Sequence, residues 1–303
     1  MEDMVKMKNK VLILGSSGFM GRNLKEFLEN ETDLYEIYAP TSNEFDISDE
    51  RAVKEQLEKR YYNVIIHTAV YNPRTGFNKD SSKELDKNLR MFFNFEKYQS
   101  LYGKMLYFGS GAEFDKRGEI CMINEGNAGN GIPSTDYGFY KYIINRSIQH
   151  SKNIYNLRVF GLFGKYENWK STFISGACCK ALKNLPITIR QNVYFDYLYI
   201  DDFCRIVKWF IDHYVNYKEY NVTTGKRIDL LTIADIVRQV SGKEIPVYVC
   251  KEGLANEYSA SNQRLLNEMG NFIFTPMEDA IHDLYIWYHK HEEDIDLYSL
   301  LYS

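Results

Sequence analysis

The sequence predicts an α/β protein built on a doubly wound parallel sheet, and three observations carry this prediction. Short apolar runs recur at residues 11–14, 36–39, 64–67, 105–108 and 156–160. Their length and continuity suit strands that are buried on both faces of a parallel sheet. Between them, residues 23–30, 50–60, 83–99 and 137–149 have apolar side chains spaced three and four apart, as in helices. A glycine-rich turn directly follows the first run and opens the first helix. Strands and helices that alternate in this way are joined by right-handed crossovers in a doubly wound sheet.

The second half of the chain is less regular and predicts a smaller C-terminal α/β part. Helical patterns cover residues 171–183, 202–214, 231–240 and 278–289. We expect residues 1–165 to form the sheet domain, with residues 192–225 returning to it. Residues 166–191 and 226–303 then form the second part.

Composition excludes several classes of protein. The 303 residues are 45% apolar and 26% charged, which is typical of a folded globular chain. A net charge of −4 leaves no basic face for nucleic acid. No apolar run reaches about 18 residues, so no membrane span is expected. The five cysteines have no Cys-x-x-Cys spacing, so the sequence predicts reduced thiols in the cytoplasm, without disulfides and without a bound metal.

The glycine turn has the features of a dinucleotide phosphate site. Residues 15–21 read Gly-Ser-Ser-Gly-Phe-Met-Gly, with Gly15 at the end of the first strand and Gly21 inside the first helix. Such glycines allow a tight turn, a close backbone approach to pyrophosphate and close packing of helix on strand. The N–H groups at the start of the helix then bind the phosphates.

A second motif has the features of an acid–base site. Tyr137 and Lys141 lie four residues apart in a predicted helix, so they share a face. A phenol with its ordinary pKa of about 10 acts at neutral pH only beside a cation. Ser110 ends the fourth strand, at the edge of the sheet where ligands bind in doubly wound folds.

Together these motifs resemble the extended short-chain dehydrogenase/reductase superfamily, which is the NAD-dependent epimerase/dehydratase family. The glycines are spaced Gly-x-x-Gly-x-x-Gly, and Ser110, Tyr137 and Lys141 match a Ser–Tyr–Lys triad. Residues 157–164 and 196–202 match two later family segments. The resemblance implies a Rossmann domain that binds the cofactor, a C-terminal part that binds a nucleotide-linked sugar, and a homodimer formed through helices 83–99 and 137–149.

The resemblance also implies a set of cofactor-binding residues. NADP(H) is favoured because no acid precedes Glu44 after the second strand, and NAD(H) is the alternative. Arg22 fits either an adenosine phosphate contact or a solvated helix position, and Asp46 fits either an adenine contact or a helix N-cap. His67 is expected to be a packed strand residue. The implied set is Gly15, Ser17, Gly18, Phe19, Met20, Gly21, Arg22, Asp46, Ile47, Thr68, Ala69, Val70, Asn88, Tyr137, Lys141 and Phe160. Within it, Asn88 matches a family residue that braces the active-site helix.

Candidate substrate contacts follow from the same comparison. They are Ala112, Gly161, Lys180, Arg190 and Arg264. Gly161 stands where the family usually has asparagine, and the three basic residues equally fit a solvated surface. Ala112 has no titratable group, so it cannot supply the second acid–base group that dehydratases and bifunctional epimerase-reductases use. Glu113 has a carboxylate, but it does not occupy the position of the turn at which dehydratases carry their acids.

These observations favour one function and leave two others open. The triad without a further acid–base group suits NAD(P)H-dependent reduction of a 4-keto deoxysugar nucleotide. It also suits a sugar-nucleotide 4-epimerase, which oxidises and re-reduces one carbon. A non-catalytic cofactor-binding module ranks third. Such relatives usually lose the tyrosine or the lysine, whereas this chain has both.

Overall fold

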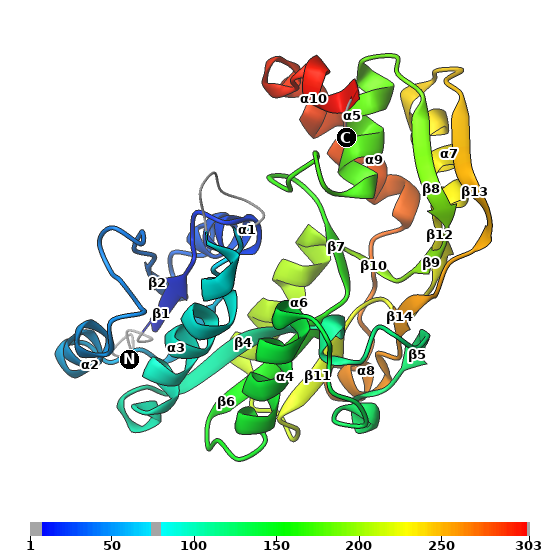
Figure 1. Ribbon diagram of the computed structural model, residues 1–303. Coiled ribbons are helices and arrows are strands. Elements are labelled where there is room, and N and C mark those ends of the chain that lie inside the picture. The colour runs from blue at the N-terminus through cyan, green and yellow to red at the C-terminus, as the bar shows by residue number, and fades with distance from the viewer. Residues whose placement is uncertain (1–7, 74–79, 302–303) are drawn as a thin grey trace. The chain divides into compact units, whose positions relative to one another are not determined.

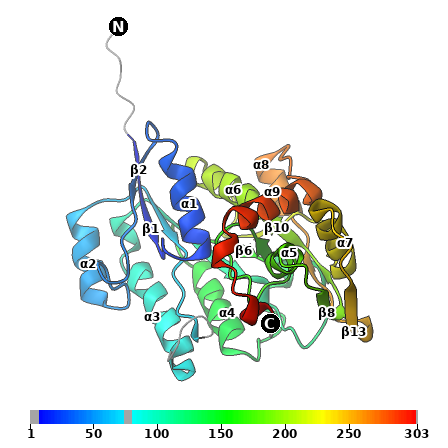
Figure 2. The ribbon, with the colours of Figure 1, turned by 90° about the horizontal axis from the view of Figure 1, so that it is seen from above.

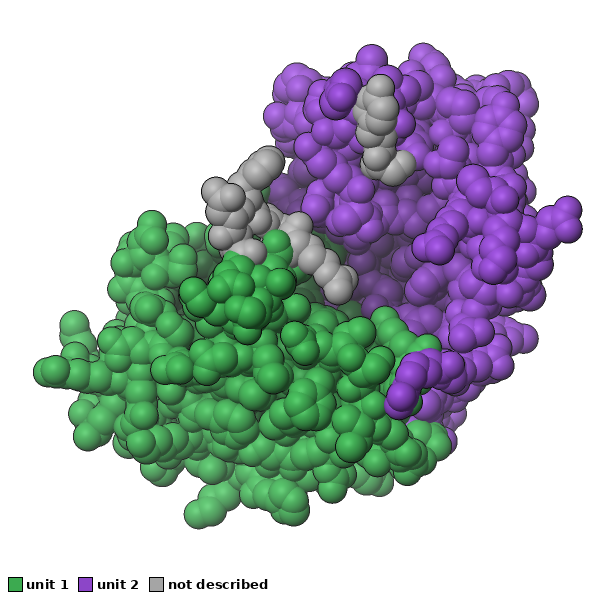
Figure 3. Space-filling model, in the orientation of Figure 1, with its two compact units in different colours: residues 1–116, 125–159, 206–220 green, residues 117–124, 160–205, 221–303 purple. Residues whose placement is uncertain are grey.

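The computed structural model describes residues 8–73 and 80–301. Within it the chain divides into two compact units (Figure 3). Unit 1 comprises residues 1–116, 125–159 and 206–220, and unit 2 comprises residues 117–124, 160–205 and 221–303. Figure 1 shows the order of their helices and strands along the chain.

Unit 1 is built on a six-stranded sheet in the order β11-β6-β4-β3-β1-β2. Neighbours from β2 to β6 in this order pair in parallel. The strands are β1 (Asn9–Leu14), β2 (Tyr35–Tyr38), β3 (Val64–His67), β4 (Lys104–Ser110), β6 (Ile154–Val159) and β11 (Glu219–Val222). Because β2 and β3 lie on opposite sides of β1, the order of the strands reverses there. Doubly wound sheets bind ligands at this reversal, beyond the carboxyl ends of the strands.

Helices cover both faces of this sheet. They are α1 (Phe19–Glu29), α2 (Glu50–Lys59), α3 (Glu84–Glu96) and α4 (Asp136–Ile148), and the second half of α6 (Ile200–Asp212) also belongs to unit 1. Figure 2 shows α1 on one side of the strands and α2, α3 and α4 on the other. The face under α2, α3 and α4 is a single apolar cluster that includes Leu12, Ile65, Phe95 and Ile144.

Local sequence sets where two of these helices begin. Asp49 is the N-cap of α2, and its carboxylate accepts hydrogen bonds from the N–H groups of Arg51 and Ala52. Thr135 is the N-cap of α4, and its hydroxyl accepts the N–H of Gly138 at 3.2 Å. Both residues are favoured at this position because they satisfy N–H groups that the first helical turn leaves without partners.

Unit 2 contains short strands and a group of helices. The helices that lie wholly in it are α5 (Phe173–Leu182), α7 (Leu230–Ser241), α8 (Gln263–Met269), α9 (Met277–Lys290) and α10 (Leu297–Leu301). The strands are β5 (Ile120–Ile123), β7 (Gly161–Phe163), β8 (Ile187–Asn192), β9 (Tyr194–Phe195), β10 (Tyr197–Tyr199), β12 (Ile228–Asp229), β13 (Val247–Leu254) and β14 (Tyr258–Ala260). They form one four-stranded sheet, β12-β9-β14-β5, and the pairs β10-β7 and β13-β8.

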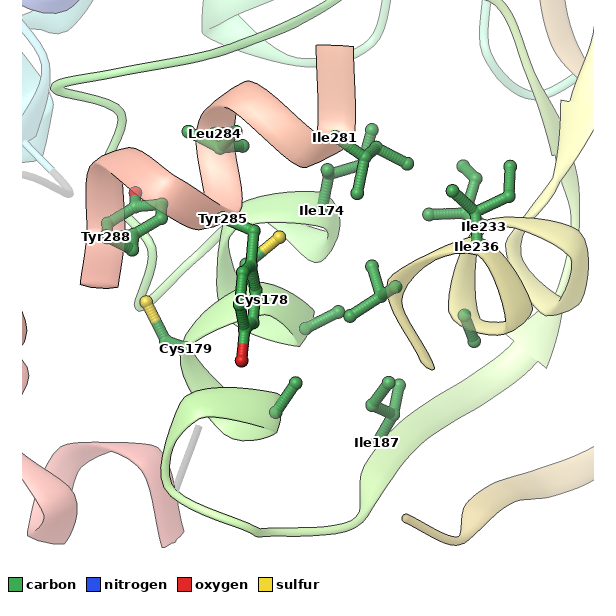
Figure 4. Packing of buried hydrophobic residues seen from close by; sticks show 14 of the residues in the cluster. Ile174, Cys178, Cys179, Ile187, Ile233, Ile236, Ile281, Leu284, Tyr285 and Tyr288 are labelled. Carbon is green, nitrogen blue, oxygen red and sulfur yellow. The ribbon is translucent and has the colours of Figure 1, made fainter. Parts of the chain in front are cut away.

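The core of unit 2 lies between α5, α7 and α9 (Figure 4). Cys178 of α5, Ile233 of α7 and Ile281 of α9 are each fully buried in it. Cys178 is therefore a packing residue, and burial raises the pKa of its thiol above the ordinary range.

The predicted fold class is confirmed, and each predicted strand and helix is present. The helix predicted at 202–214 begins two residues earlier, at Ile200. Several strands of unit 2 were not predicted, because they lack an apolar pattern. In β13, for example, all residues after the first are exposed.

Candidate functional site

The glycine turn between β1 and α1 is shaped by close backbone contacts. Gly15 has a φ of +80°, and a Cβ there would lie 2.7 Å from the backbone of Ala69. A Cβ on Gly21 would lie 2.2 Å from the carbonyl oxygen of Gly15. Gly18 is the N-cap of α1, and no side chain among the described residues caps the helix. The first turn of α1 therefore has no side-chain cap among the described residues, and uncapped N–H groups of this kind can bind a phosphate.

The segment after β3 is fixed against this turn. The Thr68 hydroxyl donates to the carbonyl of Leu14 at 2.7 Å, which ties β3 to the end of β1. Asn88 of α3 donates to the carbonyl of Tyr71 at 2.9 Å and accepts the Tyr71 N–H at 2.9 Å. These bonds hold the backbone around Ala69 and Val70 beside the glycines. Asn88 thus braces the segment after β3, whereas the resemblance implied that it braces the active-site helix.

The end of β2 also meets the glycine turn. The Ser16 hydroxyl donates to the Ala39 carbonyl at 3.1 Å. Beyond it, the Glu44 carboxylate accepts the N–H and the hydroxyl of Thr41, both at 2.8 Å. These two bonds lower the pKa of Glu44.

Arg22 and Asp46 flank this region. Arg22 is about half exposed and pairs with Glu26 at 3.3 Å, one helical turn further along α1. Asp46 accepts the N–H and the hydroxyl of Ser48, so it is not the helix N-cap that the sequence offered as an alternative. The N-cap of α2 is Asp49, and the next residue after Asp46, Ile47, is buried.

Ser110 lies at the end of β4, where the chain turns into the short helix η4 (Gly111–Glu113). Its hydroxyl accepts the N–H of Ala112 at 3.2 Å. Its own N–H donates to the Glu113 carboxylate at 3.1 Å. This reciprocal arrangement is a capping box, and it fixes the conformation of the Ser110 turn.

Helix α4 packs directly against the Ser110 turn. A Cβ on Gly138 would lie 2.5 Å from the Ala112 carbonyl, so only glycine allows this approach. Tyr137 precedes Gly138 and is half-buried, and its ring packs edge-to-face on Tyr140 with the centroids 5.5 Å apart. The helix therefore brings Tyr137 to the turn that carries Ser110 and Ala112.

Lys141 is buried on the same face of α4. Its ammonium group donates to the carbonyl of Phe108, two residues before Ser110. It lies 6.0 Å from the ring centroid of Tyr137 and 4.5 Å from that of Tyr107. Burial lowers the pKa of Lys141 to about 8, and the negative charge of Glu113 opposes this shift. Lys141 thus binds the backbone near the end of β4, and α4 packs at Gly138 against the turn that follows β4.

A buried ionic network lies beneath this site and was not predicted from the sequence. Glu113 and Arg158 are both fully buried, and the Arg158 guanidinium lies 2.8 Å from the Glu113 carboxylate. Asn156 donates to the same carboxylate at 3.2 Å, and Glu219 accepts a further bond from Arg158. The Ser-x-x-Glu spacing of a capping box at 110–113 is the sequence signal that could have found Glu113.

Ser17, Phe19 and Met20 lie in unit 1, at the glycine turn and the start of α1, whereas the predicted residues from Phe160 onward belong to unit 2. Phe160 packs on Tyr258 with ring centroids 5.1 Å apart, and the Gly161 N–H donates to the Asp196 carbonyl at 3.2 Å. The Lys180 ammonium donates to the Thr188 hydroxyl of β8 at 2.9 Å.

The three basic residues predicted to contact the substrate lie on three elements of unit 2. Arg190 lies two residues beyond Thr188, so both project from the same exposed face of β8. Lys180 of α5 reaches this face through Thr188. Arg264 lies separately on α8.

Three features bear on other classes of site. Among the residues described, no group of three or more His, Cys, Asp or Glu could hold a metal ion. Over residues 8–73 and 80–301, none of the five cysteines forms a disulfide. In the same part of the chain, no helix is both long and apolar enough to cross a membrane.

Comparison with known proteins identifies the family. The model of the NAD dependent epimerase/dehydratase family matches residues 11–223, well over half of the chain. The chain belongs to this family. The resemblance inferred from the glycine turn and from the Tyr137–Lys141 motif is therefore confirmed at the level of the family.

Relatives within the family agree with this assignment. GDP-L-colitose synthase of Yersinia pseudotuberculosis is 22% identical over 291 residues, which cover 86% of this chain and 92% of that protein. The GDP-L-fucose synthetase of Naegleria fowleri bound to NADP superposes with a TM-score of 0.83 at 18% identity and covers 95% of both chains. A GDP-mannoheptose C4 reductase from Campylobacter jejuni, with NADP bound, gives 0.78 at 17% identity, over 94% of this chain and 99% of that one. These similarities confirm the fold.

Proposed function

We propose that this protein reduces the C4 ketone of a sugar linked to a nucleoside diphosphate, with NADPH as the preferred reductant. The observation that carries the proposal is the packing of α4, which bears Tyr137 and Lys141, on the end of β4 and the turn after Ser110. Family membership and the names of the relatives, which are synthases or reductases of GDP-linked sugars, support the same substrate class.

The glycine turn fits the cofactor. The absence of a Cβ at Gly15 and Gly21, and the N-terminus of α1 without a side-chain cap among the described residues, leave room for a pyrophosphate beside donor N–H groups. When bound, the nicotinamide supplies the hydride that reduces C4. Lys141 would bind the nicotinamide ribose, and Arg22 would face the adenosine phosphate.

Within this proposal Tyr137 is the general acid. As C4 is reduced, its ketone oxygen gains negative charge, and the Tyr137 phenol gives its proton to that oxygen. The Ser110 hydroxyl donates a hydrogen bond to the same oxygen and stabilises the developing charge. The Lys141 ammonium favours the phenolate that remains.

Ala112 favours simple reduction over the other reactions known in this family. It is buried beside Ser110, at the position where a second acid–base group would have to act. A methyl group cannot move a proton, so loss of water or inversion at a neighbouring carbon has no catalyst there. Reduction of the ketone needs only the three groups around β4.

NADPH oxidation followed at 340 nm tests the proposal. A panel of 4-keto sugar nucleotides, prepared with GDP, dTDP and UDP, is offered with NADPH and in parallel with NADH. We expect stoichiometric loss of NADPH with at least one substrate. Interconversion of two 4-hydroxy sugar nucleotides without net oxidation would instead indicate a 4-epimerase. Tight NADPH binding with neither reaction would indicate a binding module.

We also propose that Lys180 and Arg190 bind the substrate diphosphate. Their placement at the exposed face of β8 supports a shared anion site within unit 2. Replacing Arg190 by Ala should raise KM for the sugar nucleotide with little change in kcat, because the lost contact is the same in ground state and transition state. Arg264→Ala is the comparison variant, since Arg264 lies separately on α8.

The homodimer stays a prediction, which sedimentation equilibrium would test.

A further inference from the structure

The Glu113 carboxylate lies beneath the Ser110 turn and is surrounded by donors. The Ser110 N–H donates to one oxygen at 3.1 Å, and Arg158 Nε donates to the other at 2.9 Å. Asn156 donates to both oxygens at 3.2 Å. Gly109 makes room for this carboxylate, because a Cβ there would lie 2.1 Å from Glu113 Oε1. Burial raises the pKa of Glu113, but all of these partners donate to the carboxylate and so favour its ionised form.

The network joins every element of unit 1 that carries a triad residue. Asn156 of β6, which donates to Glu113, also donates to Asn145 of α4 at 3.0 Å. Asn145 lies one helical turn beyond Lys141. Hydrogen bonds therefore run from the Ser110 turn, through Glu113 and Asn156, to the helix that carries Tyr137 and Lys141.

The buried charges of this network balance. Glu113 and Glu219 carry the negative charges, and Arg158 and Lys141 carry the positive ones. Glu219 contacts Arg158 and Asn145, whereas Glu113 contacts Arg158 and the Ser110 turn. Neutralising Glu113 would leave two cations against one carboxylate in a poorly solvated region. The cation that can lose its proton is Lys141, because arginine stays protonated in proteins.

We propose that Glu113 is a positioning residue of the active site: it fixes the Ser110 turn and keeps Lys141 in its ammonium form. This inference rests on the proposed function for its catalytic consequence. Its electrostatic part concerns Lys141 alone and can be measured without any substrate.

Other groups also face Lys141 and set the background for the test. Glu113 reaches it from the turn after β4, and the charge of Lys141 in turn lowers the pKa of His67 at the end of β3. Three phenol rings lie within 6.0 Å of its ammonium group, those of Tyr107, Tyr137 and Tyr140. None of these aromatic groups carries a negative charge at neutral pH, so Glu113 is the group whose neutralisation should change the titration of Lys141.

NMR of the full protein labelled with ¹³C at lysine Cε measures this titration, with the Lys141 resonance assigned by its loss in Lys141→Arg. In the wild type we expect Lys141 to be protonated at pH 7. In Glu113→Gln we expect its midpoint to fall by on the order of one pH unit. Glu219→Gln is the matched control, because it removes the other carboxylate of Arg158 but does not touch the Ser110 turn. Its Lys141 midpoint should fall by less than that of Glu113→Gln, because Glu113 is the carboxylate whose charge acts on Lys141.

Turnover supplies the second readout. We expect Glu113→Gln to lower kcat at pH 7, by about twofold through the smaller ammonium fraction of Lys141, which recovers at lower pH, and further through the altered Ser110 turn, which does not recover; NADPH affinity should change little. An unchanged Lys141 midpoint in folded Glu113→Gln would overturn the inference. If Glu113→Gln does not fold, a wild-type midpoint below pH 7 overturns it and one above pH 7 supports it. Absence of 4-keto reduction in the wild type would reject the proposed function alone, since the midpoints do not depend on it.

Discussion

The two units of this protein each bury a large cluster, but the two clusters are of opposite character. Between α5, α7 and α9 of unit 2, the buried side chains are almost all aliphatic or aromatic, as Figure 4 shows. At the end of β4 in unit 1, the buried groups include Lys141, Glu113, Arg158 and Asn156. Both regions exclude water, but the second contains an ion pair and an amide that bind one another directly.

This difference determines which side chains can be replaced in each cluster. An apolar cluster is stabilised by the area that it buries and by its packing, so many side chains of similar volume can fill it. A buried carboxylate or guanidinium requires a specific partner for each donor and acceptor. A buried ionic arrangement stabilises the fold little more than an apolar one would. Its presence beside Ser110 and Lys141 therefore agrees with a role in function.

The largest expected effect is on turnover and concerns Tyr137. Tyr137→Phe removes the proposed general acid and should lower kcat by 10²- to 10⁴-fold, with NADPH affinity close to that of the wild type. The rate is measured by NADPH oxidation and the affinity by quenching of protein fluorescence.

Tyr140→Phe is the matched control for Tyr137. It lies three residues further along the same helix, and its hydroxyl is buried without a hydrogen-bond partner among the described residues. Its removal should leave kcat within about threefold and stability unchanged or slightly higher. Equal losses in the two variants would show that the helix, and not the Tyr137 phenol, is what turnover requires.

The next largest effect is on the stability of unit 1. Arg158→Met would leave Glu113 and Glu219 buried without their shared cation, at a cost of about 3–5 kcal/mol in the free energy of unfolding. Arg227→Met is the comparison in unit 2, where the Arg227–Glu257 pair is 2.8 Å long but Arg227 is about half exposed. We expect a much smaller loss there, because water screens an exposed ion pair. Denaturant unfolding measures both, and similar costs would mean that burial does not distinguish the two ion pairs.

A smaller loss is expected from the apolar cluster. Ile281→Ala on α9 should lower the free energy of unfolding by about 3 kcal/mol, because it opens a cavity among fully buried neighbours. Ile273→Ala, at a position that is 80% exposed, should change it by less than about 0.5 kcal/mol. Because neither residue belongs to the charged network, folded Ile281→Ala should keep the wild-type pH profile of turnover. A changed profile would show that the two clusters are coupled.

Most of the fold of unit 1 could be predicted because its strands are apolar throughout and its helices are amphipathic. The strand predicted at 64–67 is β3 to the residue, and the helix predicted at 50–60 is α2 within one residue. In unit 2, β9, β10, β12 and β14 have only two or three residues, and the longer β13 is exposed over nearly its whole length, so none of these shows a period. β8 alternates buried and exposed residues at 187–190, a signal that could have found it.

The candidate site could be predicted in part for a similar reason. Tyr137 and Lys141 lie on one helix, so their spacing alone places them together. The contact between Glu113 and Arg158 depends instead on the pairing of β4 with β6, in which Gly109 lies opposite Arg158. That register joins residues 45 positions apart, and no local pattern in the sequence specifies it.

The smallest expected effect is a change of stability with pH, and it concerns His67. This residue packs against aromatic rings of unit 1 and is also affected by the charge of Lys141. Its ring lies 6.0 Å from that of Phe95 and 5.5 Å from that of Tyr107. Burial, together with the charge of Lys141, lowers the pKa of His67 to about 4. Below pH 6.5 the unfolded chain therefore binds a proton that the folded chain does not, and stability falls until about pH 4.

His67→Phe tests this, because phenylalanine fills a similar space among aromatic rings and does not titrate. Between pH 7 and pH 5, the free energy of unfolding of the wild type should fall by about 2 kcal/mol more than that of His67→Phe. His282→Gln, at an exposed position on α9, should behave as the wild type because its ring meets water in both states. Parallel losses in wild type and His67→Phe would mean that His67 gains its proton in the folded protein as easily as in the unfolded chain. Neither burial nor the charge of Lys141 would then oppose protonation of His67 in the folded protein.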